Sequence, residues 1–420
     1  AMQAQKERAR AARSNEQSMH SQSKDLMDFT KVSEFTGYTD SKSEGTVIGL
    51  FKDGVKVDEL SGEGDLILSK TCFYAESGGQ CADTGKVYND TFKADVTNVI
   101  KAPHKQALHH LENVEGTIRV GDVLTGEYDY AKRQLTRANH SSLHLLQEAL
   151  REVLGDHIAQ AGSYNCPEYA RFDFTHFEKP SEEQLNEVER IVNEHINDAY
   201  PVVTEVMSID EAKKTGATAL FDEKYGDTVR VVTMGPSKEF CGGTHASNTA
   251  DLGCFKIVSE ESIGSGVRRI ECVTKMEAYK ALKANEIKLN DLRDSLKLKN
   301  SDMISGRVDQ MKQNISSLEN EKAQLLLRVL NLDSDVAASK AKGDDVKYVV
   351  LKTNDLQYNL KDYANAIKNK LDGGAVFIGN VANGKYSFVC ALGNKASEKG
   401  LDAGSLVKEA ASLCEGKGGG

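Results

Sequence analysis

The sequence lacks features that would assign it to several protein classes. No apolar run approaches the roughly eighteen residues needed to cross a membrane. The first 24 residues are charged and polar, which excludes the apolar segment of a secretory signal. The eight cysteines follow no regular spacing, so we expect free thiols in a reducing, cytoplasmic setting. Tryptophan is absent, and this absence excludes nothing about function.

The net charge of −10 is unevenly distributed along the chain. Residues 25–274 are strongly acidic, whereas the remainder is net positive. An acidic middle argues against broad, non-specific nucleic-acid binding in that span. An RNA contact there would need local basic clusters, such as those at residues 132–137 or 268–269. Charge alone therefore does not predict an RNA partner.

At 420 residues the chain is too long for one compact core, so two or three domains are expected. The residue patterns predict an α+β multidomain fold in five pieces. Residues 1–25 resemble the end of a helix, and residues 26–129 alternate as in a small β-barrel. Residues 130–274 read as an α+β core, 275–332 as a helical or coiled-coil linker, and 333–420 as a small C-terminal α/β domain.

Individual elements can be placed within three of these pieces. The expected strands and helices, in chain order, are strands 46–51, 86–88 and 116–121, helix 130–154, strand 346–351, helix 355–371, strands 374–379 and 386–390, and helix 404–413. The chain closes with the glycine-rich segment Gly416–Gly420. Such a segment is typical of a flexible tail or, inside a domain, of a close backbone approach to a partner.

Residues 275–332 carry apolar residues in two heptad registers, interrupted near Ser305-Gly306. The interruption indicates a hinge or the turn of an antiparallel helix pair. The registers are Leu282, Leu289, Leu292, Leu296 and Met303, and then Ile304, Val308, Met311, Ile315, Leu318, Leu325 and Val329. The pattern is compatible with two helices that pack only on each other, with dimerisation, and with RNA docking.

Two pairs of metal-ligating residues stand out. His140 and His144 lie one turn apart on the helix predicted from Tyr130 to Leu154, so their side chains project from the same face. Cys241 and His245 have the same spacing around a double glycine that follows a valine-rich strand. Two pairs of nitrogen and sulfur ligands suit a tetrahedral zinc ion. The alternative is that these residues are surface histidines and a buried free cysteine.

Five short motifs then carry a resemblance. They are the segment from Phe73–Gln80 through Ala82–Gly85, and then His140–His144, Arg171–Phe174, Cys241–His245 and Gly264–Ile270. In this order they resemble the editing half of alanyl-tRNA synthetase and its free-standing relatives, the AlaX proteins. Residues 1–10 are similar to the helix by which the synthetase leaves its tRNA-recognition domain. The coiled region and terminal domain resemble the synthetase's C-terminal domain, which is shared with some DHH phosphoesterases.

The resemblance implies that His140, His144, Cys241 and His245 hold zinc. Four protein ligands normally close a zinc site and make it structural. If one ligand is displaced, the open position can activate water or hold the amino group of the substrate. Because an aminoacyl ester is already labile, positioning and carbonyl polarisation can suffice. Zinc as anchor and organiser is therefore favoured over a zinc-bound hydroxide as the nucleophile.

The resemblance also implies roles for three further residues. Gln160 matches a family position implicated in editing, with a surface amide as the alternative. Gln80, after Gly78-Gly79, either contacts substrate or braces a turn. Arg269 is a candidate for phosphate, although adjacent residues of a strand point to opposite faces. Leu143 departs from the family pattern, because bacterial members often carry a hydroxyl residue there.

The activity implied by the resemblance is hydrolysis of tRNA(Ala) mischarged with serine or glycine. An alanine pocket discriminates weakly against an added hydroxyl and against a smaller residue, so a second, hydrolytic site is needed. The chain has no room for a class II aminoacylation core, so alanine activation is not expected. No Asp-His-His triplet occurs, which argues against a phosphoesterase.

Two other classes of function remain open. One is a non-enzymatic tRNA-binding and oligomerisation module with a structural zinc, which includes a homodimer through the C-terminal region. The other is a generic zinc hydrolase such as a peptidase. The absence of an HExxH motif weakens this second alternative.

Overall fold

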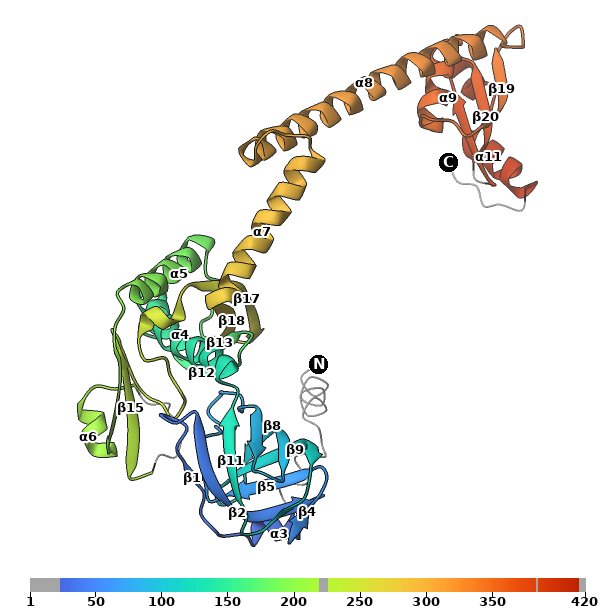
Figure 1. Ribbon diagram of the computed structural model, residues 1–420. Coiled ribbons are helices and arrows are strands. Elements are labelled where there is room, and N and C mark those ends of the chain that lie inside the picture. The colour runs from blue at the N-terminus through green and yellow to red at the C-terminus, as the bar shows by residue number, and fades with distance from the viewer. Residues whose placement is uncertain (1–22, 219–225, 383, 415–420) are drawn as a thin grey trace. The chain divides into compact units, whose positions relative to one another are not determined.

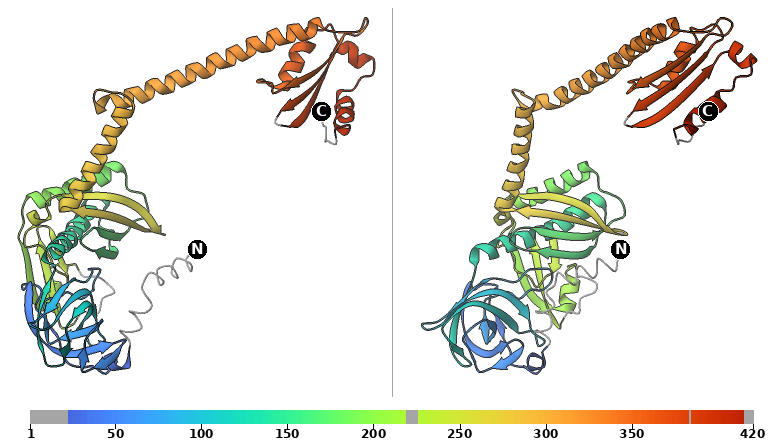
Figure 2. Two further views of the ribbon diagram at one scale, coloured as in Figure 1. Left: turned by 45° about the vertical axis from the view of Figure 1, so that its right-hand side comes forward. Right: turned by 90° about the vertical axis from the view of Figure 1, so that its right-hand side faces the viewer.

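The computed structural model describes residues 23–218, 226–382 and 384–414 (Figures 1 and 2). The predicted helix end at residues 1–25 lies almost wholly outside them, as does Gly416–Gly420. The chain divides into two compact units, residues 1–288 and 289–420. No helix in the described ranges is long and apolar enough to cross a membrane.

The first unit begins with a closed six-stranded antiparallel barrel, as the sequence predicts. The ring closes because β11 pairs with both β7 and β2. Its strands, in order around the ring, are β11 (Val123–Tyr128), β7 (Gly85–Tyr88), β8 (Lys93–Lys101), β9 (Ala107–Glu115), β5 (Gly64–Leu68) and β2 (Lys42–Lys52). In β2, the alternate residues Ser43, Gly45, Val47 and Gly49 are buried, as period-2 patterning requires. The barrel core includes Leu50, Leu66, Phe73, Val96 and Leu111.

Short elements complete the barrel. They are α3 (Lys24–Met27), β1 (Glu34–Phe35), β3 (Val55–Val57), β4 (Glu59–Leu60), β6 (Lys70–Thr71) and β10 (Ile118–Arg119). The strand expected over residues 116–121 is reduced to β10, because Gly116 and Gly121 both adopt positive φ angles and end the extended segment on either side.

The second part of this unit is an α+β layer that carries the predicted ligand pairs. A four-stranded antiparallel sheet has the order β12-β13-β18-β17, and a three-stranded antiparallel sheet has the order β14-β15-β16. The elements are α4 (Tyr130–Leu154), β12 (Gln160–Asn165), β13 (Ala170–Thr175), α5 (Glu182–Asn197), β14 (Val202–Ser208), α6 (Ile209–Lys214), β15 (Thr228–Met234), β16 (Ser237–Phe240), η1 (Thr249–Leu252), β17 (Phe255–Gly264) and β18 (Val267–Thr274).

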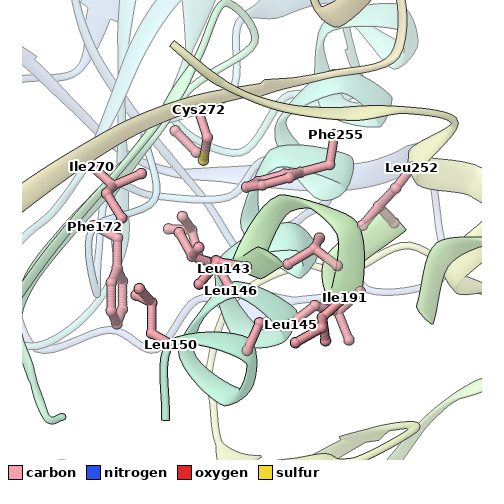
Figure 3. Packing of buried hydrophobic residues seen from close by; sticks show 14 of the residues in the cluster. Leu143, Leu145, Leu146, Leu150, Phe172, Ile191, Leu252, Phe255, Ile270 and Cys272 are labelled. Atoms are coloured by element: carbon pink, nitrogen blue, oxygen red, sulfur yellow. The ribbon is translucent and has the colours of Figure 1, made fainter. Parts of the chain in front are cut away.

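Helix α4 is the central element of this layer. Its bounds are those of the predicted helix. The Asp129 side chain caps the first turn by accepting from the backbone N–H of Lys132, and Gly155 ends the helix with φ 116°. Figure 3 shows Leu146 and Leu150 packed near Phe172 in the same buried cluster. This packing fixes the rotation of α4 and therefore the direction of its histidines.

Two helices follow, α7 (Lys275–Ser295) and α8 (Ile304–Ser339), with a short 3-10 turn η2 (Ser301–Met303) before the second. The interruption predicted near Ser305-Gly306 is present, but it lies at residues 296–303, and both Ser305 and Gly306 are in the first turn of α8. Helix α7 ends at Ser295, shortly before Lys297, whose backbone adopts a left-handed φ of 54°. Gly306 does not interrupt α8, because one glycine in a helix costs only about 1 kcal/mol. Most of the predicted heptad residues are exposed: Leu282, Leu289, Leu292, Met303, Val308, Met311, Ile315, Leu318, Leu325 and Val329.

The second unit ends in a small α/β domain, as predicted. Strands β19 and β20 are parallel, and β20 and β21 are antiparallel. The elements are β19 (Tyr348–Asn354), α9 (Leu360–Lys368), β20 (Ala375–Ala382), β21 (Lys385–Leu392), α10 (Asn394–Glu398) and α11 (Ala403–Ser412). Leu330 and Ala337 of α8 join its core, so this helix continues beyond residue 332 into the domain.

Candidate metal centre

The two histidines of α4 face one side of the helix, as their spacing predicts. The rings of His140 and His144 are stacked with their centroids 5.5 Å apart, and both side chains are buried. Cys241 and His245 reach the same point from the segment that follows β16. The ligand atoms of all four residues lie within 4.8 Å of one another. We call these four residues the metal cluster.

The spacing of the metal cluster fits zinc. Two atoms bound at about 2.0–2.3 Å to one tetrahedral ion lie roughly 3.3–3.7 Å apart. The Cys241 Sγ atom lies 3.4 Å from His140 Nε2 and 3.2 Å from His245 Nε2. One thiolate and three imidazoles also form a donor set that zinc prefers.

Each histidine of the metal cluster is held through its other ring nitrogen. His140 Nδ1 lies 3.0 Å from Gln80 Oε1, His144 Nδ1 lies 2.9 Å from Glu239 Oε2, and His245 Nδ1 lies 3.2 Å from Ser141 Oγ. These contacts leave the Nε2 atoms for the cluster. Outer hydrogen bonds of this kind orient metal-binding imidazoles and fix their tautomers.

Electrostatics favours the ligand forms of Cys241 and His245. Burial raises the pKa of the Cys241 thiol, but the interaction with the neighbouring imidazoles, that of His140 above all, outweighs burial and holds the pKa well below its ordinary value. Burial lowers the pKa of His245 to about 3, so its ring is neutral near pH 7. A thiolate and a neutral imidazole are the forms that bind a metal.

Gly243 permits the close approach between the two segments. A Cβ atom at this position would lie 2.0 Å from His140 Cε1 and 2.9 Å from Gln80 Oε1. At Gly242 a Cβ atom would meet nothing within 4 Å. The second glycine of the pair is therefore the one that packing requires.

Gln80, predicted to contact substrate or brace a turn, is fully buried and bonded on both sides of its amide. Its Oε1 accepts from the Thr244 backbone N–H at 2.8 Å and faces His140 Nδ1, while its Nε2 donates to Thr244 Oγ1 at 2.9 Å. These contacts orient His140 and connect the Gly78–Gln80 segment to the Cys241–His245 segment. This geometry favours a bracing role.

Gln160 and Arg269 lie in different surroundings. Gln160 begins β12, donates to Ser163 Oγ at 3.0 Å and lines a small cavity beside the metal cluster. Arg269 lies on β18 and forms a two-bond ion pair with Asp173, at 2.7 and 2.8 Å. Its neighbour Arg268 pairs with Glu260 instead, so the two arginines point to opposite faces, as expected for a strand.

Two cavities border the metal cluster at Cys241. The smaller, of about 50 Å³, is lined by both helix histidines, Gln147, Gln160 and Glu239. The larger, of about 510 Å³, lies between the barrel and the α+β layer and is lined in part by Phe35, Tyr38, Lys105 and Arg230. The arrangement offers a metal position, a small polar recess and a larger basic and aromatic chamber.

Sequence reasoning missed several residues that build the centre. Glu239 lies on β16, two residues before Cys241. Because alternate residues of a strand point to the same side, this spacing was the only sequence feature that could have placed Glu239 beside the metal cluster. Tyr38 donates from its hydroxyl to the Gly242 carbonyl at 2.8 Å, and Arg230 donates to the Gly243 carbonyl at the same distance. The Arg230 guanidinium also stacks on the Tyr38 ring at 3.5 Å. No pattern in the neighbouring sequence predicts contacts between such distant segments.

Three family models match the chain. The model for tRNA synthetases class II (A) matches residues 1–132, and the DHHA1 domain matches residues 344–420. The second additional domain of threonyl and alanyl tRNA synthetases matches residues 229–271, which include Cys241 and His245. Two of these three models describe domains of tRNA synthetases.

Individual relatives narrow this assignment. The alanine--tRNA ligases of Listeria innocua and Geobacillus kaustophilus are each 41% identical to the chain, over 424 and 425 residues, and that of Bacillus subtilis is 40% identical over 425 residues. Over its whole length the chain is similar to one half of these alanine--tRNA ligases, which confirms the resemblance inferred from its motifs. Each alignment covers 100% of this chain and 48% of the relative, so the chain spans about half the length of the curated relatives it matches.

Proposed function

We propose that this chain hydrolyses the ester that joins serine or glycine to the terminal adenosine of tRNA(Ala), at a zinc site formed by the metal cluster. The observation that carries the proposal is the convergence of three braced imidazoles and one thiolate beside two cavities. The match to the second additional domain over residues 229–271 supports the same conclusion.

The chain's own residues prepare the site before any substrate arrives. Gln80, Glu239 and Ser141 hold the imidazoles in position, so little reorganisation is needed on binding. With one of its four protein ligands displaced, bound zinc would supply a Lewis acid and an anchor for the amino or carbonyl group of the ester. Because the ester is labile, accurate positioning next to water can account for much of the acceleration.

The larger cavity suits the nucleotide end of such a substrate. Its walls combine the cationic side chains of Lys105 and Arg230 with the aromatic rings of Phe35 and Tyr38. Aromatic faces stack with bases, and cations attract phosphates. With the adenosine in the larger cavity, the aminoacyl group would extend past Cys241, which borders both cavities, into the smaller one.

The test is release of the amino acid from tRNA(Ala) charged with serine, glycine or alanine, with Cys241→Ala compared with the wild type. We expect fast release of serine and glycine, slow release of alanine, and loss of release in the variant. Cys254→Ala is the matched control, because Cys254 lies outside the metal cluster and should leave release unchanged. An intact serine ester after incubation with the wild type would refute the proposal.

A second candidate, tRNA binding and dimerisation by residues 289–420, is favoured by the apolar residues exposed on α8 and by the DHHA1 match. Leu318 and Leu325 are exposed one heptad apart. Sedimentation equilibrium of the wild type and of Leu318→Glu/Leu325→Glu tests dimerisation. A dimer that the double substitution dissociates would support dimerisation through α8, whereas a monomeric wild type would refute dimerisation.

A further inference from the structure

The smaller cavity contains a buried acceptor that nothing in the cluster explains. Gln147 and Leu143 lie one turn apart on α4, and both line this cavity. Gln147 is 2% exposed and Leu143 is 4% exposed. The apolar Leu143 side chain offers no hydrogen bond, so Gln147 is the polar group of this helix face beyond the two histidines.

The orientation of the Gln147 amide follows from its neighbour. Its Nε2 lies 3.2 Å from Glu239 Oε1, and Glu239 Oε2 is the partner of His144. A carboxylate can only accept hydrogen bonds, so the amide nitrogen must face Glu239 and the carbonyl oxygen is left over. Within residues 23–218, 226–382 and 384–414, Gln147 Oε1 is buried and has no hydrogen-bond partner.

An unpaired buried carbonyl is costly unless a ligand satisfies it. Gln106 has a similarly unpaired Oε1, but it lines neither of the two cavities beside the metal cluster. Its Nε2 donates to the Phe29 and Lys31 carbonyls on the barrel side. The two glutamines therefore share burial and an unpaired acceptor, whereas Gln147 alone of the pair lies where an aminoacyl group would enter.

Resting on the proposed function, we propose that Gln147 is the residue that recognises serine, with its Oε1 accepting a hydrogen bond from the serine hydroxyl. The neighbouring Leu143 contacts the serine methylene. The α-amino group is common to serine and glycine, so its contacts cannot distinguish the two substrates. A neutral amide oxygen matches the neutral hydroxyl.

The experiment compares serine with glycine, which differ at the hydroxymethyl group that Gln147 would read. Gln147→Met removes the acceptor at nearly constant side-chain length, and Gln106→Met makes the same change outside the cavities. Full-length chains are assayed on tRNA(Ala) charged with either amino acid. For Gln147→Met we expect serine release to fall roughly ten- to a hundredfold and glycine release to stay within about threefold. For Gln106→Met we expect an unchanged ratio of serine to glycine release.

A second readout does not depend on hydrolysis. The seryl and glycyl amides of 3′-amino-3′-deoxyadenosine are titrated into each protein by calorimetry. Gln147→Met should weaken binding of the seryl amide by roughly tenfold or more and leave the glycyl amide unaffected. Equal weakening of both amides would mean that Gln147 reads the common ammonium or only supports His144, and would overturn the inference.

The outcomes separate this inference from the proposed function. If the wild type releases both amino acids and the variant loses both alike, or neither, the inference fails and the proposed function stands. If the wild type releases neither, the proposed function fails and the inference fails with it. Serine-selective loss in Gln147→Met, absent from Gln106→Met, supports both.

Discussion

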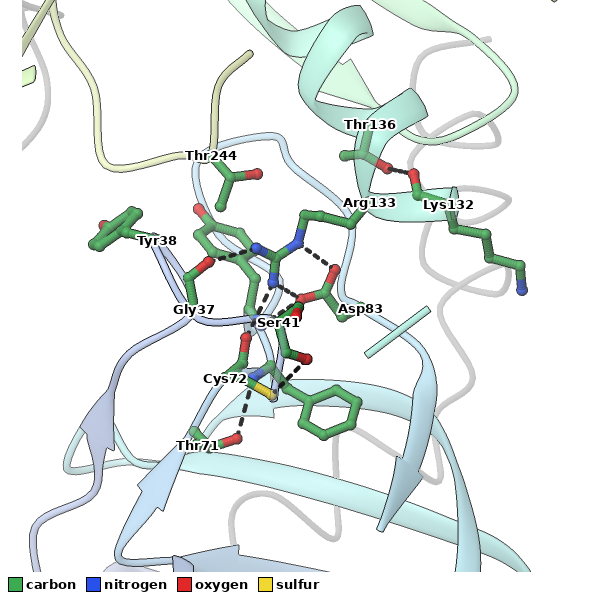
Figure 4. A network of polar contacts seen from close by, with 12 residues as sticks. Gly37, Tyr38, Ser41, Thr71, Cys72, Asp83, Lys132, Arg133, Thr136 and Thr244 are labelled. Atoms are coloured by element: carbon green, nitrogen blue, oxygen red, sulfur yellow. Dashed lines mark hydrogen bonds and ion pairs between the residues drawn. The ribbon is translucent and has the colours of Figure 1, made fainter. Parts of the chain in front are cut away.

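Arg133 Nε donates to Asp83 Oδ1 at 2.7 Å, and both side chains are almost completely buried (Figure 4). The guanidinium also donates to the carbonyls of Gly37 and Cys72, at 2.7 and 3.1 Å. Asp83 in turn accepts from the backbone N–H of Tyr74 at 2.6 Å. The pair therefore holds the first turn of α4 against the barrel segment Tyr74–Asp83. This segment contains Gln80, which contacts His140.

Arg133→Met should be strongly destabilising. Removing one partner of a buried ion pair leaves the other charge unpaired, which costs about 3–5 kcal/mol. The free energy of unfolding, measured by urea denaturation, should fall by that amount. Arg119→Ala is the control, because the Arg119–Glu59 pair is 70% and 60% exposed and should contribute at most about 1 kcal/mol. Equal losses in the two variants would contradict the prediction.

Gly243→Ala should disrupt the metal cluster, whereas Gly242→Ala should not. The added methyl group at residue 243 would overlap the His140 ring, while at residue 242 it enters open space. We expect Gly243→Ala to bind zinc at least about tenfold more weakly, as loss of an orienting contact does. Competition with a chromophoric chelator measures the affinity. Wild-type affinity in the Gly243 variant would show that the backbone shifts freely.

Zinc content should follow Cys241. We expect about one zinc per chain in the wild type, because the metal cluster supplies four ligands to one ion. Cys241→Ala should lose most of it, since three ligands and a neutral site bind zinc less tightly. Elemental mass spectrometry of the dialysed protein measures the number of zinc ions per chain. Cys272→Ala, a buried cysteine outside the cluster, should retain the metal.

His109 should make barrel stability depend on pH. Burial lowers its pKa from 6.5 to about 4, and both ring nitrogens are engaged, with Leu66 and Thr71. Between pH 6.5 and 4 the unfolded chain therefore binds more protons at this residue than the folded chain does. Stability from this group is complete above pH 6.5 and falls with decreasing pH, by up to about 1.4 kcal/mol per unit.

The variant His109→Gln isolates this contribution, since glutamine keeps a donor and an acceptor but does not titrate. Between pH 7 and pH 5 it should lose about 2 kcal/mol less unfolding free energy than the wild type does. His104→Gln serves as control because His104 is exposed. Parallel pH profiles for wild type and His109→Gln would refute the assignment.

Local signals predicted much of the fold and the pairs of the metal cluster. The helical pattern over residues 130–154 predicted the bounds of α4, and the helix then sets His140 beside His144. The break between α7 and α8 was misplaced because Gly306 is a strong sequence signal, yet the left-handed turn occurs at Lys297, which carries no such signal. Helix propensity indicates which residues tend to end a helix, but tertiary packing decides at which residue the helix ends.

Contacts between distant segments could not be predicted in this way. Gln80 is 60 residues from His140 and 164 from Thr244, and nothing in its neighbourhood indicates that its amide joins them. The sequence around Glu239 and Ser141 likewise does not indicate their contacts with His144 and His245, although each residue is close to a ligand in sequence. A single sequence identifies chemically distinctive residues, whereas their hydrogen-bond supports emerge only once the tertiary structure is known.

The barrel contributes no ligand to the metal cluster, yet two of its side chains hold the parts that do. Gln80 fixes the ring of His140, and the Tyr38 hydroxyl holds the carbonyl of Gly242. The affinity of the proposed zinc site would thereby be coupled to the folding of a neighbouring β-structure. A substitution that unfolds the barrel would weaken zinc binding although it changes no ligand. The zinc content of a variant would therefore report whether residues 26–129 are correctly folded.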